Sequence, residues 1–136
     1  MKKFITSILL LFVALFVNAQ VLHIYGGEGH DVYLGSLNTD PYDNGSIWNE
    51  YGAYGSSYSS KSIWNEYGSE YSQYSPWNEY ASYPPVIVDK SGNFYGYLTV
   101  NKYKDKRSRL RLANILCANY EEIREDVSEW YDRIFE

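Results

Sequence analysis

The chain has 136 residues, a formal net charge of −5 and a single cysteine, Cys117. An acidic chain is a poor partner for nucleic acid, whose phosphates bind basic surfaces, and one cysteine cannot form a disulfide within the chain. Because the composition includes 16 tyrosines and four tryptophans, aromatic side chains are the expected source of the hydrophobic core.

Residues 1–19 have the three parts of a secretory signal peptide. Lys2 and Lys3 give a positive start, the run from Phe4 to Val17 is almost wholly apolar, and Ala19 ends a small-residue cleavage site. Since the apolar run is shorter than the roughly 20 residues that a spanning helix needs, we expect cleavage after Ala19 and no membrane span afterwards. The sequence thus predicts a secreted or periplasmic protein, whose net charge changes from −5 to −7 when the two lysines are removed.

Residues 20–39 predict two strands joined by a glycine-rich loop. Leu22 and Ile24 alternate with polar or aromatic neighbours, and Val32 and Leu34 do the same after the loop. Alternation of this kind places apolar side chains on one face of a strand and leaves the other face to solvent.

The next segment, residues 40–83, repeats one motif three times, as Ser46–Gly52, Ser62–Gly68 and Ser75–Ala81. Each copy contains Ser-x-Trp-Asn-Glu-Tyr, with isoleucine, isoleucine and then proline at the second position. A serine that accepts a backbone N–H, followed by a position that tolerates proline, is typical of the start of a helix. We therefore expect each copy to form a one-turn helix, and the high aromatic content argues against a disordered segment.

Residues 84–101 predict a β-hairpin. Val86–Val88 is a short apolar run, and Phe94–Val100 alternates between two faces. Asp89–Asn93 lies between them and has the composition of a turn, including a glycine that can adopt positive φ. We expect the two runs to pair in antiparallel fashion, with Asp31–Gly35 as a candidate further strand.

The rest of the chain predicts two helices, because its charges divide sharply. Residues 102–111 carry six basic groups and one acid, whereas residues 112–136 carry two basic groups and seven acids. One continuous helix would place both ends against the helix dipole. Asn119 is a candidate N-cap, so we expect a short helix near 108–117 and a longer one near 120–134.

Together these elements predict an α+β fold, with a small antiparallel sheet, serial one-turn helical Trp/Tyr repeats and a C-terminal helical segment. Successive motif tryptophans lie 16 and then 13 residues apart, which does not suit the uniform coils of a solenoid. We expect residues 20–101 to form an aromatic-repeat α+β domain and residues 102–136 to form the helical segment. That segment carries an apolar stripe that should dock on the domain or on a partner: Ile123, Val127, Trp130 and Ile134.

Residues 32–101 resemble small secreted bacterial proteins of uncharacterised function with Ser-Ile-Trp-Asn-x-Tyr-Gly repeats. The resemblance rests on Leu34–Asn38, on the three copies of the motif, and on the element Pro84–Tyr97. Related sequences often look like Leu-Gly-Cys-Leu-Asn-Cys at the first element, where this chain has Ser36 and Thr39. The resemblance implies an exported repeat module and supplies no catalytic residues.

The sequence predicts no metal site and no cofactor. One cluster of potential ligands comprises His23, Glu28, His30 and Asp31, and another comprises Asp40, Asp43 and Asn44. A metal needs about three converging ligands, and the first cluster has the spacing of no metal motif. The second lacks the spacing of an EF-hand, and we interpret it as a series of side-chain-stabilised turns.

The glutamates of the motif, Glu50, Glu66 and Glu79, are the candidate acids of a carboxylate-dependent hydrolase. They occupy equivalent places in separate copies, which argues against catalysis because an acid–base pair works in two unlike environments within one cleft. The chain also lacks a phosphate-binding loop and a dinucleotide fingerprint. We expect a protein without enzymatic activity and keep the hydrolase as a second alternative.

The aromatic side chains of the motif are the candidate ligand-binding residues: Trp48, Tyr51, Trp64, Tyr67, Trp77 and Tyr80. They either form a core or stand on the surface as a platform for sugar rings. The leading prediction is an exported non-enzymatic repeat protein that interacts with an envelope or surface component, and the alternative is a carbohydrate or cell-wall glycan-binding module. Solvent exposure of the tyrosines separates the two, since a contiguous exposed aromatic patch favours binding.

Overall fold

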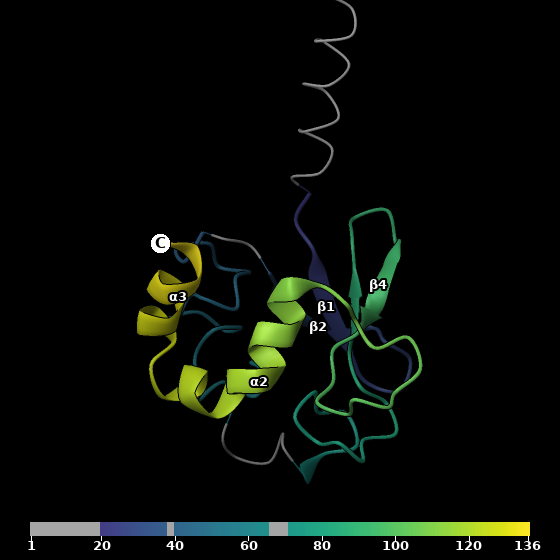
Figure 1. Ribbon diagram of the computed structural model, residues 1–136. Coiled ribbons are helices and arrows are strands. Elements are labelled where there is room, and N and C mark those ends of the chain that lie inside the picture. Colours follow the sequence, from purple (N-terminus) through teal and green to yellow (C-terminus); the bar gives the residue numbers. More distant parts are fainter. Residues whose placement is uncertain (1–19, 38–39, 66–70) are drawn as a thin grey trace, which may run out of the picture.

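The structure is a computed structural model that describes residues 20–37, 40–65 and 71–136 (Figure 1). Its elements, in chain order, are β1 (His23–Gly26), β2 (Val32–Ser36), β3 (Val86–Val88), β4 (Phe94–Tyr97), α2 (Arg111–Glu125) and α3 (Val127–Phe135). A four-stranded antiparallel sheet with two C-terminal helices confirms the predicted α+β class. The predicted signal peptide, residues 1–19, lies outside the described residues.

The four strands form one sheet in the order β2-β1-β3-β4, and each pairs with its neighbour in antiparallel fashion. The predicted hairpin is β3 and β4, and the predicted further strand is β2, which forms the opposite edge. Ile24 and Ile87 face each other across the two central strands, and both are fully buried. This pair fixes the centre of the sheet on the hydrophobic core.

Strand β4 ends at Tyr97, three residues before the predicted end of the strand. The reason is a tight return of the chain: the Tyr97 N–H donates to the Lys106 carbonyl at 2.9 Å, and the Ser108 N–H donates to the Tyr97 carbonyl at 2.9 Å. Gly96 permits this approach, because a Cβ at its position would lie 2.4 Å from the Cα of Ser108. We call residues 98–110 the basic loop, and these contacts hold it against the edge of β4.

The β3–β4 turn is organised by one carboxylate. Asp89 accepts hydrogen bonds from the backbone N–H groups of Ser91 and Asn93, the Asn93 side-chain amide and the Tyr95 hydroxyl, all within 3.0 Å. These donors, led by the Asn93 amide, lower the pKa of Asp89 below its ordinary value. Gly92 has φ of +84°, as expected for this turn.

The repeats fold as successive β-turns, and the prediction that each copy forms a one-turn helix is therefore wrong. No helix occurs in residues 40–65 or 72–83, which we call the turn segment. Backbone N–H groups instead close turns by donating to the carbonyl three residues earlier, in most places at three-residue intervals. These donors belong to Asp43, Ser46, Asn49, Gly52, Gly55, Ser59, Ser62, Asn65, Ser75 and Ala81. The chain does bend after each motif serine, as predicted, but the bend ends at the following asparagine.

Side chains explain why a helix does not continue. In each copy the serine Oγ accepts the N–H of the tryptophan two residues later, at 3.1, 3.1 and 3.0 Å. The asparagine Oδ1 then accepts the N–H of the tyrosine, at 3.1 Å for Tyr51 and 2.9 Å for Tyr80. Each such side chain begins a new turn. The next turn therefore starts at the following serine or asparagine, and the hydrogen-bond pattern of a continuous helix does not form.

The turn segment buries its tryptophans in a column of aromatic rings. Trp48 and Trp64 have ring centroids 6.1 Å apart, and Trp64 and Trp77 are stacked at 5.7 Å. The indole N–H of Trp64 donates to the Ile47 carbonyl at 2.8 Å, and that of Trp77 donates to the Ile63 carbonyl. The second and third copies are therefore each bonded to the copy before. In the first copy, the buried indole N–H of Trp48 has no partner among the described residues.

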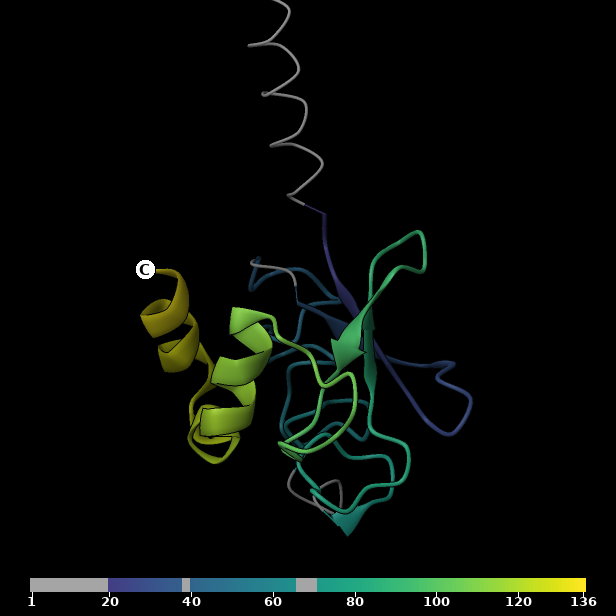
Figure 2. The ribbon, with the colours of Figure 1, turned by 45° about the vertical axis from the view of Figure 1, so that its right-hand side comes forward.

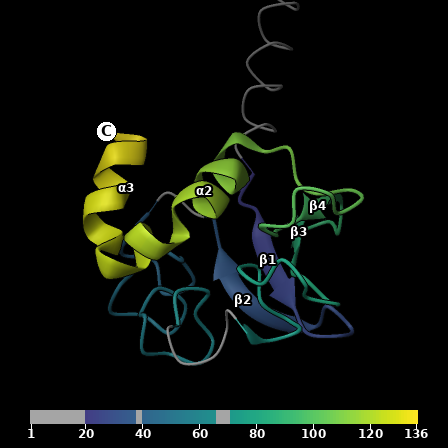
Figure 3. The same ribbon diagram turned by 60° about the horizontal axis from the view of Figure 1, so that its bottom comes forward.

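The two helices close both ends of this column. Tyr120 of α2 stacks on Trp77 at 4.8 Å with the ring planes 2° apart. At the other end, Phe135 and Tyr131 of α3 lie 5.5 and 6.0 Å from the Trp48 ring. Figures 1 and 2 show the helices on one side of the molecule and the sheet on the other, and in Figure 3 the first part of the turn segment lies beside α3.

The predicted break at Asn119 is a kink inside α2, where φ is −132°. A second break, which was not predicted, lies at Asp126, whose carboxylate accepts the Glu129 N–H and begins α3. The single helix expected near 120–134 is therefore corrected to two. The apolar stripe docks as predicted: Ile123 and Val127 belong to the core, and Trp130 and Ile134 pack against it.

Candidate functional site

The structure separates the predicted ligand-binding residues into two groups. Trp48, Trp64 and Trp77 are only 2, 0 and 4 % exposed, so their ring faces are part of the core. Tyr51 and Tyr80 are 92 and 81 % exposed and present their rings to solvent. The sixth predicted residue, Tyr67, lies outside the described residues. The motif tryptophans therefore belong to the core, whereas the two described motif tyrosines stand on the surface.

A groove of about 1000 Å³ lies beside the third copy of the motif. One wall is the turn Trp77–Tyr80, together with Tyr71. The opposite wall is a face of α2 formed by Asn114, Cys117 and Ala118, which are three and four residues apart and so share one side of the helix. Val100, Lys102 and Arg107 from the loop that follows β4 also line the groove.

Hydrogen bonds fix the positions of these walls. The Val100 N–H donates to the Pro76 carbonyl at 2.9 Å, which ties the chain after β4 to the third copy. Within that copy, the Asn78 amide donates to the Ser72 carbonyl at 3.0 Å, while its oxygen holds the Tyr80 N–H. The groove is thus built from elements that the fold already anchors.

Two exposed tyrosines supply aromatic surface at the groove. Tyr71 is 84 % exposed and Tyr80 is nearly as open, whereas Trp77 is covered by its stacking neighbours and contributes little more than a ring edge. Interaction with the neighbouring Glu79 carboxylate raises the pKa of Tyr80 above its ordinary value. At neutral pH, Tyr80 is therefore a neutral ring with a protonated hydroxyl.

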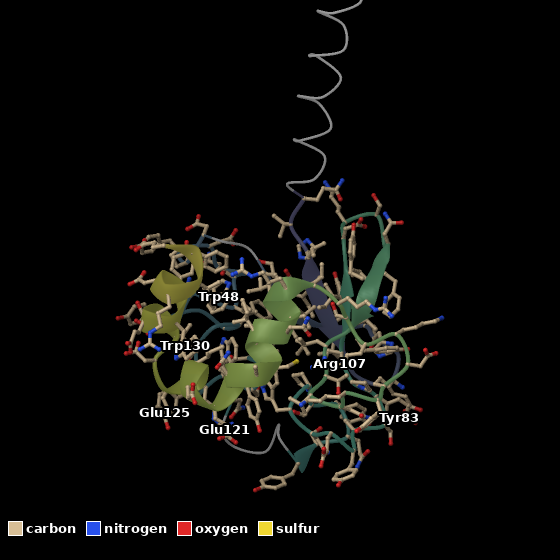
Figure 4. All side chains as sticks on the ribbon, in the orientation of Figure 1. Trp48, Tyr83, Arg107, Glu121, Glu125 and Trp130 are labelled. Atoms are coloured by element: carbon tan, nitrogen blue, oxygen red, sulfur yellow. The ribbon has the colours of Figure 1, made fainter. Side chains whose placement is uncertain are left out.

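Arg107 is the best-positioned charge at this site. Its Nε donates to the Thr99 carbonyl at 2.8 Å, and its Nη1 donates to the Asn114 amide oxygen at 3.2 Å. The thiol of Cys117 also donates to the Thr99 carbonyl, at 3.3 Å. Figure 4 labels Arg107 beside α2, on the side of the molecule that carries the sheet.

The described lining of the groove includes one thiol, that of Cys117. Burial raises the pKa of the Cys117 thiol, so this group is neutral at pH 7, and only the thiolate is a good nucleophile. Among the described lining residues, Glu79 is the one carboxylate. The predicted acid Glu50 lines a different hollow beside α3, and Glu66 lies outside the described residues. The two described motif glutamates, Glu50 and Glu79, therefore line separate hollows.

A second, smaller hollow of about 360 Å³ continues from the groove. The two hollows share Lys102, Arg107 and Asn114. The rest of the second lining is mostly basic and comes from the basic loop: Lys104, Asp105, Lys106, Ser108 and Arg109. Sequence reasoning identified the basic run 102–111 but could not place it beside the tyrosines of the third copy.

Metal binding has no support in the part of the chain that the structure describes, where no group of three or more His, Cys, Asp and Glu side chains could hold an ion. The two histidines have structural partners instead. His23 Nδ1 lies 2.8 Å from the Tyr33 hydroxyl, and His30 Nε2 lies 3.1 Å from the Pro84 carbonyl.

Comparisons of the chain with family descriptions, with curated proteins and with solved structures found no match. Across residues 20–37, 40–65 and 71–136, no helix combines the length and the apolar character that a membrane crossing requires.

Proposed function

We propose that this protein is an exported, non-enzymatic binding module that holds a glycan of the cell envelope or its surroundings in the groove beside the third copy of the motif. The observation that carries the proposal is the pairing of two exposed tyrosine rings with fixed polar groups at one hollow. Export would follow from the signal peptide predicted for residues 1–19.

The chemistry of the groove suits a carbohydrate. Sugar rings present C–H faces that pack on aromatic rings, and Tyr71 and Tyr80 offer such rings at an open site. Sugar hydroxyls need donors and acceptors in fixed places, which Asn78, Asn114 and Arg107 supply. A purely apolar ligand would make no use of the hydrogen-bonding capacity that these groups keep beyond their bonds within the protein.

Hydrolysis of a glycan is less well supported than binding. Glycoside hydrolysis uses a pair of carboxylates on opposite sides of the scissile bond. Among the described residues that line the groove, Glu79 is the single carboxylate. The nearest acid of the connected hollow, Asp105, lies on the exposed basic loop. We therefore propose binding without cleavage.

The proposal predicts that Tyr80→Ala weakens glycan binding about tenfold, which corresponds to roughly 1.4 kcal/mol. The matched control is Tyr51→Ala, because Tyr51 has the same place in the first copy and is equally exposed, but does not line the groove. A glycan array of residues 20–136 identifies ligands, and isothermal titration then compares the wild type with both variants.

Equal loss of affinity in the two variants would contradict the assignment of the site, since it would make the tyrosines interchangeable. The absence of binding across neutral and acidic glycans would contradict the proposed function itself. Both variants should keep the wild-type melting temperature, because neither exposed ring contributes to the core.

A further inference from the structure

We infer that the ligand is an anionic polysaccharide, whose sugar rings lie on the tyrosines of the groove while its carboxylate, sulfate or phosphate groups lie in the adjoining basic hollow. This inference rests on the proposed function and names the class of glycan. The inference follows from the position of the two hollows. The groove and the basic hollow share Lys102 and Arg107 and so form one continuous surface.

The basic side chains of this surface are not neutralised by acids in the described part of the chain. Six basic side chains lie within residues 102–111, and none of them forms an ion pair with a described residue. The acids of the C-terminal helices stay exposed instead, and Figure 4 labels Glu121 and Glu125 toward the far end of α2 from Arg107. An otherwise acidic protein thus keeps one concentrated basic surface, which favours an anionic ligand at that place.

The basic loop is held in shape before any ligand binds. Its return to β4 is closed by the two backbone bonds of Tyr97, and the Lys104 ammonium lies 4.8 Å from the centre of the Tyr97 ring. Arg107 is fixed through Nε and Nη1. These groups would lose little conformational entropy on binding. More of the free energy of their contacts with an anion would therefore appear as affinity.

The same surface fits a polysaccharide better than a nucleic acid. DNA carries about one charge per 1.7 Å of duplex axis. Glu79 lines the groove among the tyrosines, and the protein has a net negative charge, so a densely charged polymer would meet repulsion along much of its path. A polymer with neutral ring faces and widely spaced acidic groups satisfies the tyrosines and the basic hollow together.

The test measures affinity for three pairs of polymers by titration of residues 20–136, which contain every element of the fold described above. The pairs are polygalacturonate and its methyl ester, hyaluronate and its methyl ester, and dextran sulfate and dextran. We expect at least one acidic member to bind about tenfold more tightly than its neutral counterpart, and salt to remove this difference by screening. Single-stranded oligothymidylate serves as the nucleic-acid probe.

The matched variants are Lys102→Gln, on the shared wall of the two hollows, and Lys90→Gln, an exposed lysine in the β3–β4 turn. Lys102→Gln should bring the acidic polymer close to the affinity of its neutral counterpart, whereas Lys90→Gln should bind like the wild type. Equal binding of acidic and neutral members would overturn the inference and leave the proposed function intact. Binding of no glycan at all would overturn both, and tighter binding of oligothymidylate than of any glycan would overturn the inference in favour of a nucleic-acid partner.

Discussion

Replacing Trp64 with alanine should lower the free energy of unfolding by about 3–5 kcal/mol, the usual cost of removing a large buried aromatic side chain. Trp64 has no exposed surface, stands between two other tryptophans of the column, and donates its indole N–H to the Ile47 carbonyl. Its loss would break the column in the middle. Urea denaturation followed by far-UV circular dichroism measures the change.

Two further variants separate packing from hydrogen bonding. Trp64→Phe keeps an aromatic ring but leaves the Ile47 carbonyl without its donor, and should cost about 1–3 kcal/mol. Tyr51→Ala, at an exposed motif position, should change stability by less than about 0.5 kcal/mol. If Tyr51→Ala were as destabilising as Trp64→Ala, the core would not be centred on the tryptophans.

Removing residues 126–136, which contain α3, should destabilise the protein by several kcal/mol. The truncation takes away the buried Val127 and uncovers the end of the column, where Tyr131 and Phe135 lie against Trp48. Burial of each such side chain is worth roughly 1.5–3 kcal/mol. Thermal unfolding of the truncated and full-length chains measures the loss of stability. Tryptophan fluorescence should shift to the red as the Trp48 ring becomes exposed to solvent.

A double variant, Tyr131→Ala with Phe135→Ala, tests the same contact without shortening the chain. Asp132→Ala is its control, since Asp132 is exposed on the same helix. The double variant should reproduce most of the truncation effect and the control should not. An unchanged melting temperature in both the truncated chain and the double variant would mean that α3 does not close the column.

Patterns with a short period made the sheet and the helices predictable from the sequence. Alternation around Ile24 and around Val86–Val88 identified strands, because a strand repeats its side-chain direction every two residues. The charge division and Asn119 identified a helix break, although Asn119 donates its amide to the Ile115 carbonyl instead of capping the next helix. Asp126 was missed as a helix start, although its carboxylate follows the common N-cap pattern.

The turn segment was misread because its period is three. Small polar residues recur at Ser46, Asn49 and Gly52, and again at Ser72, Ser75 and Asn78, while aromatic residues precede the next such position. A one-turn helix and a β-turn share similar starting residues, so the serine alone could not distinguish them. The regular return of serine, asparagine and glycine every third residue was the available signal for serial turns.

The groove could not be predicted, because its walls come from separate parts of the chain. Tyr80 belongs to the turn segment, Arg107 to the basic loop and Asn114 to α2. These segments are brought together by the backbone bonds that return the chain to β4 and to Pro76, by the Arg107–Asn114 hydrogen bond and by the stacking of Tyr120 on Trp77. The sequence could predict aromatic candidates and a basic run, but not that they adjoin.

Hydroxyl-radical footprinting read by mass spectrometry tests the central claim most directly, that serial turns bury the tryptophans and expose the tyrosines. Rates of oxidation are compared between the native and the urea-unfolded protein for each peptide. We predict strong protection of Trp48, Trp64 and Trp77 in the native state, with Tyr51 and Tyr80 oxidised at nearly equal rates in both states. Native tryptophans that react as fast as unfolded ones, or native tyrosines as protected as the tryptophans, would contradict this arrangement.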